Sequence, residues 1–315
     1  MNEEKPLIIY HANCADGFTA AWVATRYFKR KFNQECELHP GVYGDLPPQV
    51  EGRHVYLLDF TYRRAVVKQL AKSAATVTIL DHHETAWKEY GEMAPANQGK
   101  NGLVLALGNF YAYFRRDQSG AMVTWRHFNP DATGPGLDME ALLLVKYVQD
   151  RDLWLFQEPN SKAINAWIFS HEYTEKNWDM LAATLNDHSG YGQACVEGKA
   201  IERKQFKDIK EFLATATQEV GICGFRVPVA NVPYHWGSDA AHILAEGKPF
   251  AATYWQDSKG DSVWGLRSDA NGEDVGAIAK AYGGGGHKHA AGFRIPLGRT
   301  LDQHLASLEE KTHAD

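Results

Sequence analysis

The stretch TVTILDHH at residues 76–83 is an apolar, β-branched run that ends on an aspartate and two histidines. Two other strand-like runs end in a similar way, because LIIY at 7–10 is followed by His11 and VYLL at 55–58 by Asp59. A buried strand has no structural need to end on such residues three times. In an open parallel sheet the carboxyl ends of the strands converge, and ligands bind there. We therefore expect these polar residues to share one site.

The order of helical and strand-like patterns predicts an α/β fold. Helical periodicity covers residues 17–32 and 62–73, and it alternates with strands predicted at 7–11, 36–39, 55–59 and 77–80. Such alternation indicates βαβ units with right-handed crossovers in a parallel sheet.

A long charged helix predicted over residues 191–218 precedes a second, smaller α/β domain. The helix is either a connector between domains or an ordinary solvated surface helix. The second domain has strand patterns at 225–232, 250–255, 263–267 and 292–295. We predict a catalytic domain at residues 1–190, a helical connector at 191–220 and a substrate-binding domain at 221–315.

Composition limits the classes of function. The chain has 315 residues, of which 44% are hydrophobic and 23% charged, as is typical of globular proteins. A net charge of −6 argues against coating of long nucleic acids, but it is compatible with short phosphorylated substrates. We find no apolar run of membrane-spanning length, and we expect no membrane association. The four cysteines form no CxxC pair, which favours reduced thiols and a cytoplasmic location.

The acidic residues near the strand ends allow two interpretations. Asp16 and Asp59 each precede a predicted helix, so either carboxylate is an ordinary helix N-cap on local grounds. Capping does not explain His11 or the histidine pair at 82–83. Imidazoles with carboxylates suit divalent ions such as Mn²⁺, and one aspartate can bridge two of them. Two ions about 4 Å apart are typical of phosphoryl-transfer sites.

A further carboxylate pair lies in the segment QDRD at residues 149–152, after an apolar helical pattern. Two acids flanking Arg151 are either a surface ion pair or a source of one more metal ligand. We favour Asp150 as the ligand, with Asp152 as a partner of Arg151 or an outer neighbour of the site.

The segment GGGGHKHAAG at residues 283–292 is the second distinctive motif. Its glycines leave backbone N–H groups open to an anion, and His287 and Lys288 add donors. A flexible loop is the alternative interpretation. Arg267, at the end of a predicted strand, either binds a phosphate bidentately or belongs to a surface ion pair.

In this order, these residues resemble the DHH phosphoesterase superfamily, which includes RecJ-like exonucleases, nano-RNases, cyclic-dinucleotide phosphodiesterases and family II pyrophosphatases. The resemblance spans the chain. Its four N-terminal motifs are similar to His11 with Asp16, Asp59, Asp81-His82-His83 and Asp150. The C-terminal glycine motif resembles the type-1 DHH-associated domain, which disfavours the pyrophosphatases.

The resemblance also implies roles for individual residues. One Mn²⁺ would be held by His11 and Asp59 and a second by Asp16, Asp59, His82 and Asp150, with Mg²⁺ or Co²⁺ as alternatives. Asp81 would orient an imidazole, and His83 would lie near the reacting phosphate. The substrate's phosphate or terminal nucleotide would be bound by Arg267, Gly284, Gly285, Gly286 and His287.

One segment departs from the pattern of the superfamily. Many members carry two aspartates in the first motif, whereas this chain has Asn13-Cys14-Ala15-Asp16. The first metal would then be bound weakly, or with Asn13 or Cys14 nearby.

These observations lead to one expected function and two alternatives. We expect a Mn²⁺-dependent phosphodiesterase that uses activated water to hydrolyse short single-stranded oligonucleotides or small dinucleotides, with a homodimer as one option for its assembly. The alternatives are a nucleotide 3′-phosphatase and a nucleotide-binding regulatory protein with a weakened metal site. Base stacking is conceivable for four tryptophans, although core positions are more usual: Trp22, Trp125, Trp154 and Trp167.

Overall fold

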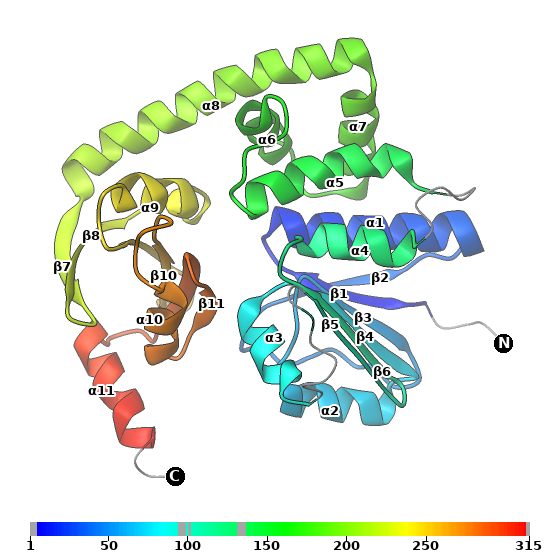
Figure 1. Cartoon of the computed structure of the whole chain (residues 1–315), viewed down its shortest axis with the longest axis horizontal. Helices are drawn as coiled ribbons and strands as arrows, with labels where there is room; N and C mark the ends of the chain where they lie inside the picture. The colour runs from blue at the N-terminus through cyan, green and yellow to red at the C-terminus, as the bar shows by residue number, and fades with distance from the viewer. Residues whose placement is uncertain (1–4, 94–98, 100–101, 131–136, 313–315) are drawn as a thin grey trace. The chain divides into compact units, whose positions relative to one another are not determined.

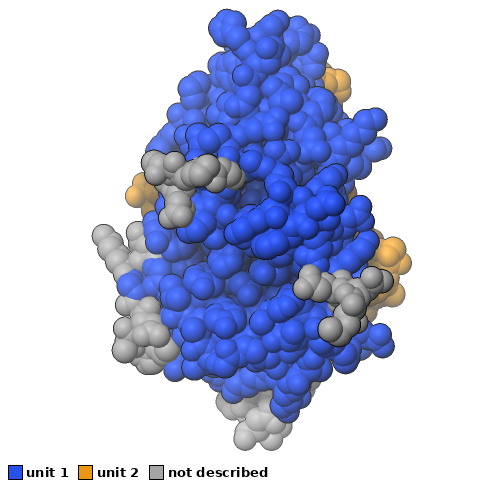
Figure 2. Space-filling view, turned by 90° about the vertical axis from the view of Figure 1, so that its right-hand side faces the viewer, with its two compact units in different colours: residues 1–203 blue, residues 204–315 orange. Residues whose placement is uncertain are grey.

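The computed structural model describes residues 5–93, 99, 102–130 and 137–312. The chain divides into two compact units, residues 1–203 and residues 204–315, which Figure 2 colours separately. The division falls inside the long helix α8 (His188–Ala216), the charged helix expected over 191–218. Each unit contains a six-stranded sheet and is described below by itself.

The sheet of unit 1 has the strand order β2-β1-β3-β4-β6-β5. Its strands are β1 (Leu7–His11), β2 (Glu37–Gly41), β3 (His54–Leu58), β4 (Thr76–Asp81), β5 (Gly102–Leu107) and β6 (Phe110–Arg115). Adjacent strands are parallel except β5 and β6, which form an antiparallel hairpin at one edge. The parallel sheet was predicted, whereas β5 was missed because a short apolar run has no diagnostic period.

Helices cover both faces of this sheet (Figure 1). On one side lie α1 (Ala15–Phe32) and α4 (Gly120–Phe128), which pack on alternate strand residues such as Ile8, Leu58 and Leu80. On the other lie α2 (Arg64–Ser73) and α3 (Glu84–Gly91), against the intervening residues, including Ile9, Leu57 and Ile79. Because both faces are buried, the central strands β1, β3 and β4 are largely continuous apolar runs, and polar residues follow at their carboxyl ends.

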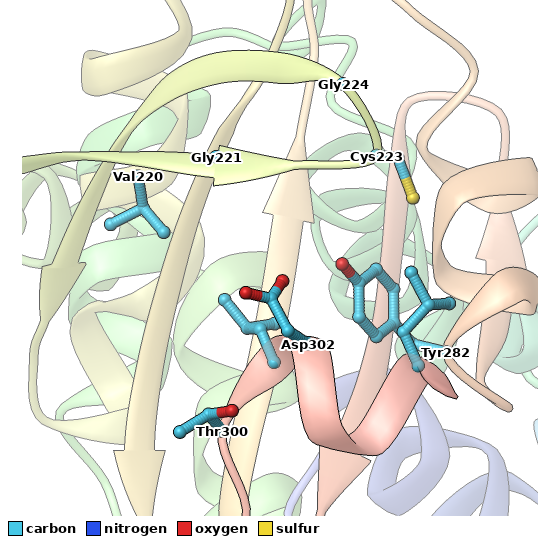
Figure 3. Close-up of a pocket in the computed structure, with 9 residues that line it drawn as sticks. Val220, Gly221, Cys223, Gly224, Tyr282, Thr300 and Asp302 are labelled. Carbon is cyan, nitrogen blue, oxygen red and sulfur yellow. The ribbon is translucent and has the colours of Figure 1, made fainter. Parts of the chain in front are cut away.

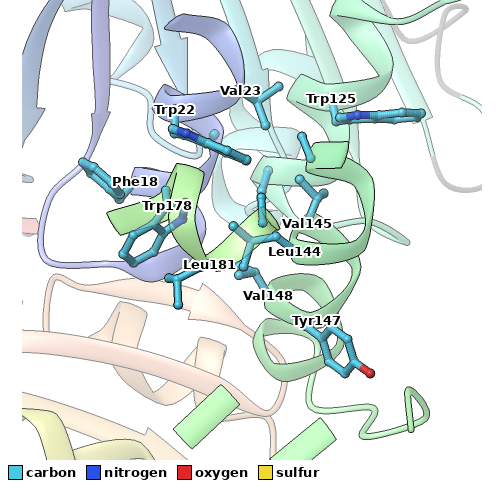
Figure 4. Close-up of a cluster of buried hydrophobic side chains, with 14 of the residues drawn as sticks. Phe18, Trp22, Val23, Trp125, Leu144, Val145, Tyr147, Val148, Trp178 and Leu181 are labelled. Carbon is cyan, nitrogen blue, oxygen red and sulfur yellow. The ribbon is translucent and has the colours of Figure 1, made fainter. Parts of the chain in front are cut away.

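A helical layer extends the core on the α1 side. It consists of α5 (Met139–Asp152), α6 (Ser161–Phe169) and α7 (Glu175–Asn186). Figure 4 shows Trp22, Trp125 and Trp178 among the aliphatic side chains of this core. Their indole N–H groups donate to Asp179, the carbonyl of Asp138 and Thr19, respectively. Trp22 and Trp125, and likewise Trp167, are therefore core residues, while Trp154 is half-buried.

The sheet of unit 2 has the order β11-β12-β10-β9-β8-β7. Its strands are β7 (Gln218–Ile222), β8 (Phe225–Asn231), β9 (Ala251–Gln256), β10 (Ser262–Arg267), β11 (Gly285–His287) and β12 (Ala290–Ile295). Only β8 and β9 run parallel, among the described pairs, and the helix α9 (Gly237–Ala245) connects them. Helices α10 (Val275–Ala281) and α11 (Leu301–Thr312) and the 3₁₀ turn η2 (Tyr234–Trp236) complete the unit.

The glycine run is more ordered than a loop. Gly283 has φ 78° and ends α10, with its N–H donating to the carbonyl of Lys280 at 3.0 Å. A Cβ on Gly284 would lie 2.1 Å from the carbonyl oxygen of Gly292, so only glycine fits there. The next residues form the edge strand β11 against β12. The flexible-loop interpretation is therefore wrong for these residues.

None of the helices in the described ranges combines the length and the apolar character that crossing a bilayer requires.

Candidate metal centre

Strands β1, β3 and β4 are adjacent and parallel, so their carboxyl ends lie in a row. That row brings His11, Asp59 and the segment 81–83 together, although they are far apart in the sequence. His11 Nδ1 lies 3.5 Å from Asp59 Oδ2, and His82 Nε2 lies 3.2 Å from Asp59 Oδ1. The expectation that these strand ends share one cluster is thus met by the geometry.

Asp59 is at the middle of the cluster. Its φ of 53° is left-handed, a conformation that aspartate tolerates at some cost in energy. It follows β3 and does not cap α2, whose N-cap is Arg63. Burial raises the pKa of Asp59, but the imidazoles of His11 and His82 outweigh that effect and hold this pKa well below its usual range. These imidazoles thus favour the anionic form of Asp59, which is 1% exposed.

Asp16 comes from the first turn of α1 but serves a different helix. Its two carboxylate oxygens accept the N–H groups of Gly120 at 2.6 Å and Ala121 at 3.1 Å, at the N-terminus of α4. The N-cap of its own helix is Cys14, so the local capping interpretation is wrong for Asp16. Burial raises the pKa of Asp16 well above its usual range, and the nearby charge of Asp59 adds to this.

Gly120 is a part of the site that sequence reasoning missed. A Cβ at this position would lie 2.4 Å from Asp59 Cβ and 2.7 Å from Asp59 Oδ1. Only a glycine allows the start of α4 to approach Asp59 while it donates to Asp16. A glycine in the first turn of a helix is common, and nothing in the local pattern marks this one.

Asp81 holds the histidine pair in place. Asp81 is fully buried. Its Oδ1 accepts hydrogen bonds from the backbone N–H groups of His82 and His83. The same oxygen accepts a hydrogen bond from His83 Nδ1, which lies 2.7 Å away. Burial raises the pKa of Asp81, but the neighbouring His83 more than offsets it, so that the pKa is lowered. The expected orienting role of Asp81 agrees with this geometry.

His82 lies among three carboxylates. Besides Asp59, its Nε2 is 3.6 Å from Asp152 Oδ2 and 3.9 Å from Asp16 Oδ2. Burial lowers the pKa of His82, but these carboxylates outweigh it and raise the pKa to about 10. The surrounding carboxylates thus favour the charged form of the His82 imidazole.

The fourth motif supplies Asp152 to the cluster in place of Asp150. Both carboxylate oxygens of Asp150 accept backbone N–H groups, from Gln157 at 2.8 Å and Glu158 at 3.1 Å. Asp150 thus shapes the turn after α5, whereas Asp152 reaches His82. The sequence favoured Asp150 because it does not reveal which way the last turn of α5 faces; the structure places Asp152, and not Asp150, beside His82.

The residues fit divalent cations. Three groups with ligand atoms within 4.8 Å of one another share Asp59: His11–Cys14–Asp59, Asp16–Asp59–His82 and Asp59–Asp81–His83. Within the described part of unit 1, the ion pairs of Asp16 and Asp59 all run to imidazole nitrogens. The buried atoms His11 Nδ1, Asp59 Oδ1 and Asp81 Oδ2 have no hydrogen-bond partner in the described chain. Buried carboxylates in such number require positive charge, which a divalent cation provides.

The residues expected to bind substrate lie in unit 2, on neighbouring strands. Strand β12 lies between β10 and β11, and its Ala290 is the register partner of both Arg267 on β10 and His287 on β11. Arg267 and His287 therefore lie in one row across the sheet. Arg267 Nη1 donates to the carbonyl of Leu266 at 2.8 Å. Gly285 and Gly286 belong to the same short strand as His287, and Gly284 directly precedes it. Four of the five predicted residues thus lie in or next to the edge strand β11, and Arg267 lies two strands away on β10.

Unit 2 also has an open hollow of about 590 Å³ between the β7–β8 hairpin and α11 (Figure 3). None of the predicted site residues lines it. The side chains of Cys223, Tyr282 and Asp302 border it, and burial raises the pKa of Tyr282 to about 12.

Comparison with known proteins supports the fold. No family model matches the chain. An uncharacterized protein of Acanthamoeba polyphaga mimivirus is 25% identical over 310 residues, which cover 92% of this chain and 68% of that protein. The DHH domain of a protein described as a member of a ribosomal-protein family has 12% identity and a TM-score of 0.55, over 97% of this chain and 86% of that one. RecJ from Thermus thermophilus, in complex with Mn²⁺, has 15% identity and a TM-score of 0.48, over 98% of this chain and 52% of that one.

The chain therefore has the α/β fold of a DHH domain, as the resemblance implied. Its particular activity is not given by the fold and is taken up next.

Proposed function

We propose that this chain is a metal-dependent phosphoesterase, and in particular a Mn²⁺-dependent phosphodiesterase of short single-stranded oligonucleotides or small dinucleotides. The observation that carries the proposal is the sharing of Asp59 among three ligand groups. A carboxylate shared in this way suits two cations that it bridges, and such pairs act on phosphoryl groups.

The distances support two ligand sets. His11 and Asp59 would hold one cation, and Asp16, Asp59, His82 and Asp152 would hold the other. Bound divalent cations supply Lewis-acid chemistry, which lowers the pKa of water and stabilises charge on phosphoryl oxygens. Mixed imidazole and carboxylate donors favour Mn²⁺, with Mg²⁺ or Co²⁺ as alternatives.

The rim of the cluster would meet the substrate. The side chains of His11, His83 and Asp152 are 29%, 17% and 27% exposed, while those of Asp16 and Asp59 are buried beneath them. His83 donates Nδ1–H to Asp81, so its Nε2 points away from that carboxylate. From there His83 would donate a hydrogen bond to a phosphoryl oxygen or to the leaving oxygen.

Unit 2 has a second group of residues that suits a phosphate. Arg267 and His287 lie in one row across the sheet. The strand that contains His287, β11, is at the edge and pairs only with β12 among the described strands. A guanidinium, an imidazole and backbone N–H groups of a glycine-rich strand suit a phosphate group. We propose that these residues bind a terminal phosphate or nucleotide.

The test is a product assay with labelled RNA and DNA, from dinucleotides upward, with and without Mn²⁺. We expect Mn²⁺-dependent release of mononucleotides, which Asp59→Asn abolishes. Release of inorganic phosphate from a nucleotide 3′-phosphate would favour the phosphatase alternative instead. Tight nucleotide binding without turnover at saturating Mn²⁺ would favour the regulatory alternative. If no product forms although both cations are bound, the proposal is wrong.

A further inference from the structure

The turn between β1 and α1 brings a thiol to the cluster. Cys14 Sγ lies 3.7 Å from Asp59 Oδ2 and donates to it. His11 Nδ1 approaches the same oxygen at 3.5 Å. The three ligand atoms of His11, Cys14 and Asp59 lie within 4.8 Å of one another.

Local backbone geometry explains why Cys14, and not Asn13, faces Asp59. Asn13 is exposed and adopts a left-handed φ of 53°, which turns the chain after β1. Cys14 is the N-cap of α1 in extended conformation, and its side chain makes no capping hydrogen bond. Gly17 lets the first turn of α1 pack on His11, because a Cβ there would lie 2.4 Å from the His11 carbonyl oxygen. The thiol is thereby held beside the imidazole.

Two buried atoms beside the thiol need a partner. His11 Nδ1 and Asp59 Oδ1 make no well-formed hydrogen bond among the described residues, since their polar neighbours are Asp59 Oδ2 at 3.5 Å and His82 Nε2 at 3.2 Å, and Asp59 is 1% exposed. A buried polar atom without a partner costs free energy. A cation held by the nitrogen, the sulfur and a carboxylate oxygen would remove that cost.

We propose that Cys14 is a thiolate ligand of a divalent cation that it holds together with His11 and Asp59. The inference rests on the proposed function only in assuming that a cation binds here. The Cys14 proton leaves to solvent when the sulfur binds, as in other thiolate sites. The ligands of the other cation, Asp16, Asp59, His82 and Asp152, offer oxygen and nitrogen alone. The centre is therefore asymmetric, and its Cys14 half prefers Zn²⁺ or Co²⁺ over Mg²⁺ because thiolate is a soft ligand.

Cobalt spectroscopy tests this ligand directly. The full chain is titrated with Co²⁺ under reducing conditions, and the thiolate-to-cobalt charge-transfer band in the near ultraviolet is recorded. We expect the band in the wild type and in the matched control Cys223→Ser, since Cys223 is exposed in unit 2. Cys14→Ser and Cys14→Asp should lose the band, and Cys14→Ser should raise the Zn²⁺ dissociation constant by about tenfold or more. Cys14→Asp should keep its affinity for Mn²⁺.

Alkylation of the wild type gives a second measurement that needs no variant. Zn²⁺ should slow the reaction of Cys14 with iodoacetamide, read by peptide mass spectrometry, more than Mg²⁺ does and without slowing Cys223. A band that persists in Cys14→Ser, or its absence in a cobalt-loaded wild type, overturns the proposal. Mn²⁺-dependent hydrolysis without the band refutes the thiolate ligand alone, whereas the band without hydrolysis refutes the proposed function alone.

Discussion

Substitution of Gly120 by alanine tests whether the start of α4 positions the cluster. The added Cβ would lie 2.4 Å from Asp59 Cβ, 2.7 Å from Asp59 Oδ1 and 2.8 Å from Asp59 Cα. Ordinary carbon contacts are about 3.5–4.0 Å, so α4 or Asp59 must move by about 1 Å. Such a movement also strains the 2.6 Å hydrogen bond from Gly120 N–H to Asp16.

Both effects have known sizes. Overpacking of a buried position costs about 1–3 kcal/mol, and weakening a hydrogen bond to a carboxylate adds about 1 kcal/mol. We expect Gly120→Ala to lower the free energy of unfolding by about 2–4 kcal/mol. A displacement of about 1 Å at a reacting centre reduces turnover by about 100-fold. Mn²⁺ affinity should fall as well, because Asp59 is common to the ligand sets.

Two further glycines supply matched controls. A Cβ on Gly198 would lie 2.0 Å from the carbonyl oxygen of Ala163, so Gly198→Ala should destabilise the chain and leave Mn²⁺ affinity unchanged. Gly192 lies in α8 with open space around it, and Gly192→Ala should stabilise the chain by about 0.5–1 kcal/mol. The assays are urea unfolding and Mn²⁺ titration by calorimetry. Wild-type Mn²⁺ affinity in Gly120→Ala, or an equal loss in Gly198→Ala, would refute the reasoning.

Three other outcomes follow from the structure. Asp152→Ala should weaken Mn²⁺ binding, measured by calorimetry, with little loss of stability. Asp150→Ala should lower the free energy of unfolding, measured in urea, by about 2–4 kcal/mol, because two hydrogen bonds to a carboxylate are lost. Burial raises the pKa of Asp138, but the ion pair with Arg26 outweighs burial and lowers this pKa. The ion pair therefore stabilises the folded chain above the unfolded pKa of about 3.9, and this contribution is lost as the pH falls through the folded pKa. Asp138→Asn should therefore flatten the acid limb of stability measured by urea unfolding, and an unchanged limb would contradict this. Saturating Mn²⁺ at about 100 times its dissociation constant should stabilise the chain by about 2.7 kcal/mol, a gain that EDTA reverses in a thermal melt.

The strand ends of unit 1 could be predicted because each depends on local sequence. An apolar run that ends on His11, Asp59 or Asp81 reveals both the strand and the polar residue after it. Parallel pairing then places neighbouring carboxyl ends together without further information. The α/β class and the shared cluster followed from these patterns.

Other features depend on contacts between distant segments. Asp16 accepts hydrogen bonds from Gly120 and Ala121, more than a hundred residues later in the chain. The choice between Asp150 and Asp152 depends on how the end of α5 is turned toward β4. No periodicity encodes these directions, because they arise when separate helices pack on one sheet.

Local sequence thus shows which ligand types are available and at which strand ends they stand. Tertiary structure alone decided which carboxylate completes the cluster, why Gly120 carries no side chain, and that Cys14 faces Asp59. Each residue type fixes the ligand atoms that it offers, whereas the orientation and separation of the side chains depend on how segments that are remote in the chain pack together.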